Sequence, residues 1–93
     1  MVPGLTTHAR ARMQQRGIPV SALDALLDFG RAAHDHRGAQ IVYFDKRARR
    51  QVERVLGPLQ SRRIERFFGT YAVLGAEGEI RTVGHRVRRV RHV

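Results

Sequence analysis

Tyr71-Ala72-Val73-Leu74 and Glu79-Ile80-Arg81-Thr82-Val83 flank the short segment Ala76-Glu77-Gly78. Both flanking runs contain aromatic or β-branched residues, which favour strands. The segment between them ends in a glycine, which can adopt the positive φ of a tight turn. Residues 71–83 therefore predict a β-hairpin.

A second pair of strands is expected upstream, at residues 31–36 and 40–44. The clearer strand contains Ile41-Val42-Tyr43-Phe44, and the polar stretch 34–40 separates the two runs. Because hairpins rather than crossover helices join the strands of each pair, the pairing is antiparallel.

Two helices precede these strands. The first spans residues 8–16, with Thr7 as its expected N-cap and Gly17 at its end. The second is expected to start at a pair resembling a capping box, Ser21 and Asp24, and to end at Gly30. Its apolar positions recur at helical spacing and are expected to face the core: Val20, Leu23, Leu26 and Leu27.

A third helix is expected over residues 46–56, after the N-cap Asp45 and before the break at Gly57-Pro58. Its expected buried stripe is Val52, Val55 and Leu56. Residues 59–68 are ambiguous and are interpreted as a short helical turn that enters a strand.

The element order is therefore helix, helix, strand, strand, helix, strand, strand. It predicts an α+β fold with an antiparallel four-stranded sheet and about three helices on one face. No repeat or linker divides the 93 residues, so one domain over 1–93 is expected, with a flexible basic tail at about 87–93.

Charge is the strongest compositional signal. Eighteen basic and eight acidic residues give a net charge of +10, and Lys46 is the one lysine among them. Arginine matches phosphate geometry and this surface attracts polyanions, so RNA is the expected partner. An acidic protein partner and a merely solubilising charge are the alternatives.

Other features exclude several classes of protein. No apolar run approaches the roughly 20 residues that cross a bilayer, so no membrane association is expected. The N-terminal residues do not resemble a signal peptide, and cysteine is absent, which argues against disulfide-rich secreted domains and zinc sites. The expected location is the cytoplasm, and the oligomeric state is left open.

Candidate site residues fall into two groups. His8, Arg12 and Arg16 lie at i, i+4 and i+8 on one stripe of the first helix, beside Ala9 and Met13, which can pack inward. The second group lies at a strand end and in the tail: Thr82, His85, Arg86, Arg88 and Arg89. Imidazole can transfer protons and guanidinium can hold phosphate. The alternative for each group is an ordinary solvated basic face.

Known motifs for phosphate loops, activated nucleophiles or paired carboxylates are absent, and His34-x-His36 is a weak metal pair. Neither a metal nor another cofactor is therefore expected. Cleavage of a phosphodiester would have to use RNA, because its 2′-hydroxyl can act as the nucleophile while imidazole moves protons and arginine stabilises charge.

Three stretches together resemble a small prokaryotic family, domain-of-unknown-function family 4258. They are residues 8–18, Tyr43-Phe44-Asp45 with its basic helix, and residues 71–86. The resemblance covers roughly residues 7–88. It implies a RelE-like toxin fold, metal-independent RNA cleavage leaving a cyclic phosphate, and control by an antitoxin. The matching site positions are His8, Arg12, Thr82 and Arg86.

Three hypotheses follow for the function. The first is a RelE-like endoribonuclease, with His8 or His85 as acid or base, Arg12 and Arg86 as phosphate ligands and Thr82 as an orienting hydroxyl. The second is a non-catalytic RNA- or DNA-binding module, and the third is a protein that docks an acidic partner. The first hypothesis predicts that the two residue groups converge in space.

Overall fold

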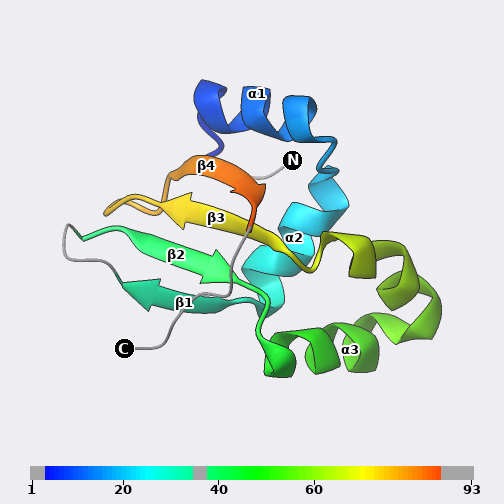
Figure 1. Cartoon of the computed structure of the whole chain (residues 1–93). Coiled ribbons are helices and arrows are strands. Elements are labelled where there is room, and N and C mark those ends of the chain that lie inside the picture. The colour runs from blue at the N-terminus through cyan, green and yellow to red at the C-terminus, as the bar shows by residue number, and fades with distance from the viewer. Residues whose placement is uncertain (1–3, 35–37, 87–93) are drawn as a thin grey trace.

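The structure is a computed structural model that describes residues 4–34 and 38–86. Its elements follow the predicted order, and its four strands form one antiparallel sheet with the order β1-β2-β3-β4 (Figure 1). The predicted α+β fold class is confirmed. The elements are α1 (Thr7–Arg16), α2 (Val20–Phe29), β1 (Arg31–His34), β2 (Gln40–Tyr43), α3 (Lys46–Ile64), the 3₁₀ turn η1 (Glu65–Phe67), β3 (Thr70–Leu74) and β4 (Ile80–His85).

The β3–β4 hairpin forms where the sequence predicts it. The Gly75 amide donates to the Glu79 carbonyl at 2.8 Å, and Gly78 has a φ of 81°. Leu74 pairs with Ile80 but Val73 pairs with Thr82, so the register shifts by one residue near the turn. Beyond that bulge the pairing is regular as far as the end of β4.

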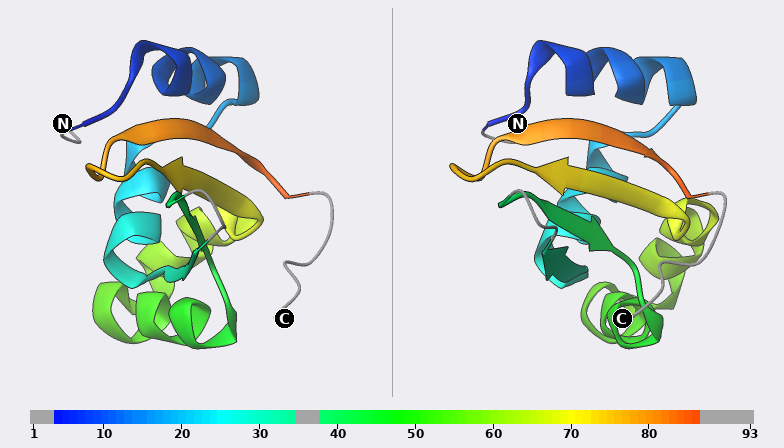
Figure 2. Two further views of the ribbon diagram at one scale, coloured as in Figure 1. Left: turned by 90° about the vertical axis from the view of Figure 1, so that its left-hand side faces the viewer. Right: turned by 60° about the vertical axis from the view of Figure 1, so that its left-hand side comes forward.

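The hydrophobic core lies between one face of the sheet and α2. Val42, Ala72 and Val83 occupy successive strands in register and are buried, as are Leu23 and Leu26 of α2. Figure 2 shows α2 and α3 on the same side of the sheet. Side chains alternate along each strand, so the next residues on β2, β3 and β4 belong to the opposite face, which we call the open face.

Helix α1 lies along the edge strand β4 and runs parallel to it (Figures 1 and 2). Near its start, the Ile80 amide donates to the Gly4 carbonyl at 2.8 Å and the Thr6 amide to the Ile80 carbonyl at 3.2 Å. Ala9 and Met13 are buried as expected. Because helix and strand run in the same direction, the last turn of α1 lies beside the last residues of β4.

Two of the predicted helix starts are wrong. Thr6 rather than Thr7 caps α1, with its Oγ1 accepting from the Ala9 amide at 3.1 Å. Pro19 occupies the N-cap position of α2, which has no side-chain cap, and Ser21 is exposed inside the helix. The helix starts earlier because proline fixes φ near the value a helix end requires.

The cap and the break of α3 follow the sequence. Asp45 Oδ1 accepts from the Ala48 amide at 2.7 Å. Gly57 interrupts the helix with φ 85° and ψ 166°, which confirms the predicted break. The chain then continues as helix to Ile64, where a turn entering a strand was expected.

The predicted burial of three apolar residues is wrong. Val55 is 60% and Leu56 38% exposed, whereas Val52 is buried. Both residues lie in the turn just before the break at Gly57, whereas Ile64 at the end of α3 is buried again. Val20 is 46% exposed as well, and the alanines Ala22 and Ala25 fill the core side of α2 instead. None of the described helices is long and apolar enough to cross a membrane.

Candidate nucleic-acid interface

Several chain segments meet at one end of the sheet. β2 and β4 end there, β3 begins there, and the last turn of α1 lies beside them (Figure 1). From these segments and the nearby first half of α3 we group four basic side chains: Arg16, Arg49, His85 and Arg86. We call these four residues the basic end of the sheet.

Arg86 is held in place by three interactions. Its backbone amide donates to the Gly69 carbonyl at 2.6 Å, and its Nη2 donates to the Phe44 carbonyl at 3.5 Å. Its guanidinium carbon lies 5.1 Å from the centre of the Tyr43 ring, within the range of a cation–π interaction. The charge of Arg86 is therefore fixed at the end of β2.

Arg49 brings a second guanidinium to the same place. Its Cζ lies 5.6 Å from the centre of the Phe68 ring, which packs against Phe44 with ring centres 5.1 Å apart. Burial and the neighbouring charge of Arg49 both lower the pKa of Arg86. The two cations are thus close enough to repel each other.

No carboxylate compensates this pair within residues 4–34 and 38–86. The ion pairs in this part of the chain join Arg31 to Asp45 at 3.8 Å and Arg81 to Glu79 at 3.5 Å. Two guanidinium groups of like charge at one end of the sheet, without a carboxylate between them, can bind an anion, because each presents several donors to an oxygen-rich ligand.

Two buried polar atoms at this end also lack a hydrogen-bond partner among the described residues. They are Arg86 Nε and Thr70 Oγ1, at the end of β4 and the start of β3. An unpaired buried donor costs about 1–3 kcal/mol, and native proteins contain few of them. A bound anion would accept a hydrogen bond from Arg86 Nε and remove that cost.

His85 lies next to Arg86 in the chain and contacts the end of α1. Its Nε2 lies 3.3 Å from the Arg16 carbonyl oxygen. A carbonyl oxygen only accepts, so this bond requires the hydrogen to be on Nε2. In the neutral ring Nδ1 then carries the lone pair and can act as a base.

The two predicted groups of site residues converge only in part. The structure brings Arg16 to His85, whereas His8 lies exposed in the first turn of α1, toward the opposite end of β4. Arg12 lies between them on α1. His85 and Arg86 extend from opposite faces of β4, because successive residues of a strand alternate.

The remaining predicted residues are spread more widely. Thr82 belongs to the same face as Arg86 but lies four residues earlier, near the bulge, where it pairs with Val73, so the two are separated along the strand. Arg88 and Arg89, like the rest of the tail 87–93, lie outside the described residues. Arg49 was not predicted as a site residue, since its position in a helix rich in arginine does not distinguish it from its neighbours.

No group of three or more His, Asp or Glu side chains within the described ranges is placed to hold a metal ion. His34 Nε2 lies 3.0 Å from Gln40 Nε2 on the adjacent strand. The second histidine of the weak metal pair, His36, lies outside the described residues.

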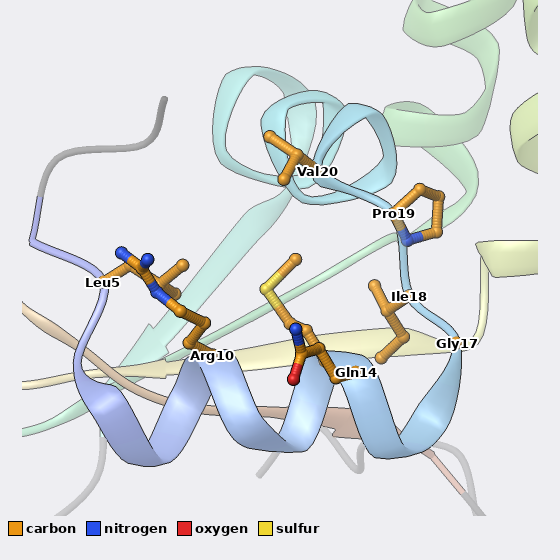
Figure 3. Close-up of a pocket in the computed structure, with 8 residues that line it drawn as sticks. Leu5, Arg10, Gln14, Gly17, Ile18, Pro19 and Val20 are labelled. Carbon is orange, nitrogen blue, oxygen red and sulfur yellow. The ribbon is translucent and has the colours of Figure 1, made fainter.

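An apolar groove lies apart from the basic end, between α1 and the start of α2. It has a volume of about 520 Å³. Figure 3 shows Leu5, Ile18 and Val20 around it, with the Arg10 guanidinium at the side of Leu5. The groove therefore combines apolar walls with one positive charge.

No family model matches this sequence, and no curated protein or solved structure is significantly similar to it. The residues and their geometry therefore carry the functional argument.

Proposed function

We propose that this protein binds RNA at the basic end of the sheet and cleaves it without a metal ion, as a RelE-like toxin ribonuclease would. The single observation that carries the proposal is the pair formed by Arg86 and Arg49. Both guanidinium groups lie over aromatic rings at the basic end, Arg86 Nε is buried and unpaired, and no carboxylate among the described residues pairs with either group. The net charge of +10 supports a polyanion as the ligand.

His85 is the proton-transfer group in this proposal. With Nε2 bonded to the Arg16 carbonyl, Nδ1 takes the proton from the RNA 2′-hydroxyl. The 2′-oxygen attacks the phosphorus, and the bond from phosphorus to the 5′-oxygen breaks. The departing 5′-oxygen takes a proton from solvent, which leaves a 2′,3′-cyclic phosphate and a 5′-hydroxyl. The RNA passes around the end of β4, where it meets His85 on one face and Arg86 on the other, and Arg86 and Arg49 stabilise the charge that develops on the phosphate.

The family assignment belongs to the same proposal. The stretches 8–18 and 71–86 resemble family 4258, and helices packed on an antiparallel sheet, which that resemblance implies, are compatible with the proposal. His8 and Thr82, which the resemblance points to, stand apart from Arg86, so we assign the chemistry to His85 in preference to them.

The test is cleavage of end-labelled total RNA by the full chain in EDTA. Wild type is expected to cut, His85→Ala to lose cutting by at least about 100-fold, and His8→Ala to retain it, since general base catalysis contributes about 10²–10⁴-fold. His8→Ala is a matched control because it removes an exposed imidazole from the other end of α1. Loss of cutting in His8→Ala with retention in His85→Ala would overturn the assignment of the base.

The alternative is a non-catalytic nucleic-acid module that uses the same arginines. It predicts steeply salt-dependent binding of RNA by wild type, no cleavage, and weaker binding by Arg86→Gln. Binding without cleavage in the experiment above would favour this alternative, and absence of both would refute the assignment of RNA as the ligand.

The apolar groove supports a second function, docking of an acidic amphipathic segment of a partner protein such as an antitoxin. Val20 is 46% exposed on the groove, and Arg10 supplies a positive charge beside the apolar wall. A designed acidic amphipathic peptide should bind wild type and lose affinity for Val20→Asp. If the peptide bound Val20→Asp and wild type equally well, the groove would be excluded as the docking surface.

A further inference from the structure

Tyr71 takes an unusual position on the open face of the sheet. It lies on β3 and pairs in register with Gly84 on β4. A Cβ atom built on Gly84 would lie 3.1 Å from Tyr71 Cε1 and 3.2 Å from its Oη. The ring therefore extends across the neighbouring strand, directly over the backbone of Gly84.

Glycine at this position explains the placement of the ring. An aromatic side chain can lie against a sheet where its cross-strand neighbour has no side chain, and such pairs stabilise glycine within strands. A ring that lies along the sheet turns one of its faces toward whatever approaches that surface. Tyr71 is partly exposed, so ligand can reach it.

The arginine that we assign to phosphate lies on the same face. Tyr43 is the register partner of Tyr71 on β2, and the Arg86 guanidinium lies over the Tyr43 ring. Neighbouring strands are about 4.8 Å apart, so the Tyr71 ring over β4 and the Arg86 guanidinium over β2 are about 10 Å apart, on the scale of a phosphate and an adjacent base. Tyr43 itself is 2% exposed and is thus not available for stacking.

We propose that Tyr71 is a base-stacking residue, on which the nucleobase adjacent to the Arg86-bound phosphate packs. The proposal rests on the proposed function, since it takes RNA as the ligand. Bases of every kind have an aromatic face, so this contact adds affinity for single-stranded RNA with little sequence preference. It also distinguishes RNA from polyanions that carry no bases.

The test compares two probes by fluorescence anisotropy at one salt concentration. One is a labelled single-stranded RNA oligomer with 2′-O-methyl groups, which lacks the attacking hydroxyl. The other is labelled inorganic polyphosphate. Tyr71→Leu should weaken binding of the RNA by between about 5-fold and 150-fold and leave polyphosphate binding unchanged. Tyr71→Phe, which keeps the ring, should retain RNA affinity, and Arg86→Gln should weaken binding of both probes.

The outcomes separate this proposal from the one it rests on. If wild type binds neither probe, the proposed function fails. If wild type binds RNA and Tyr71→Leu binds it equally well, the stacking role alone is wrong. A parallel loss for both probes in Tyr71→Leu would show a structural role for the ring and would also overturn the proposal; thermal unfolding of each variant identifies misfolding directly.

Discussion

Replacing Arg86 by methionine should stabilise the folded protein while weakening its hold on anions. The pKa of Arg86 is lowered by burial and by Arg49. A lowered pKa in the folded state means that folding disfavours the charged form relative to the unfolded chain. At neutral pH arginine remains charged, so Arg86 opposes folding, and a neutral side chain removes that opposition.

The magnitude follows from the contacts of Arg86. Its unpaired Nε costs about 1–3 kcal/mol, and methionine has no donor to leave unpaired. The substitution gives up the cation–π contact with Tyr43, worth about 0.5–1 kcal/mol at a partly exposed site. It also gives up the long bond to the Phe44 carbonyl, worth about 0.5 kcal/mol at most. The expected net gain is about 1 kcal/mol, which raises the Tm of a domain of this size by about 4–8 °C.

Thermal unfolding followed by circular dichroism in phosphate-free buffer measures this change. The matched control is Arg81→Met at the start of β4. The exposed guanidinium of Arg81 pairs with Glu79 at 3.5 Å, so its removal should change the free energy of unfolding by less than about 1 kcal/mol. Added polyphosphate should raise the Tm of wild type more than that of Arg86→Met. A Tm for Arg86→Met below that of wild type would refute the reasoning.

Three further substitutions test the fold. Gly30→Ala should cost about 1–3 kcal/mol, because its Cβ would clash with the Leu26 carbonyl oxygen; chemical denaturation should show a lower midpoint. Asp45→Ala removes the cap on the Ala48 amide and should cost about 1 kcal/mol, whereas Asp45→Asn should retain stability. The pKa of Glu79 is lowered, first by its own backbone amide, so its stabilising effect is present above its ordinary value of 4.5 and is lost as pH falls through the folded value. The Tm of Glu79→Gln should therefore fall less on acidification than the Tm of wild type. An equal fall would contradict a stabilising role for the ionised Glu79 carboxylate.

The arrangement of strands could be predicted because its determinants are local. The segment around Gly78 specifies a hairpin by its own backbone preference, and the apolar runs on either side supply the strands. Burial along α3 could not be predicted in this way. Val52 and Leu56 share a helical stripe, but only Val52 is buried, because burial depends on which other elements pack against each turn of the helix.

The site was harder to predict than the fold for a related reason. The sequence groups His85 and Arg86 as neighbours in one candidate site, but side chains alternate along β4, so these two extend to opposite faces. Arg49 and Arg86 come to the same end of the sheet because β2 and β4 end where β3 begins, a consequence of strand register that no short motif records. His8 and His85 carry the same chemistry in the sequence. They differ in position because α1 runs parallel to β4. His8, in the first turn of α1, therefore lies toward the start of β4, whereas His85 lies at its end.

The pairing of α1 with β4 has a consequence for how the chain folds during synthesis. Helix α1 is made early, yet the strand it covers is completed only when the ribosome reaches His85. Until then Ala9 and Met13 lack the strand they pack against, and α2 must assemble with α3 and the first three strands. The contacts of α1 span most of the chain, so closing them carries the largest loop entropy in the fold. Docking of α1 is thus expected to be the final step, completed only after the whole sheet has formed.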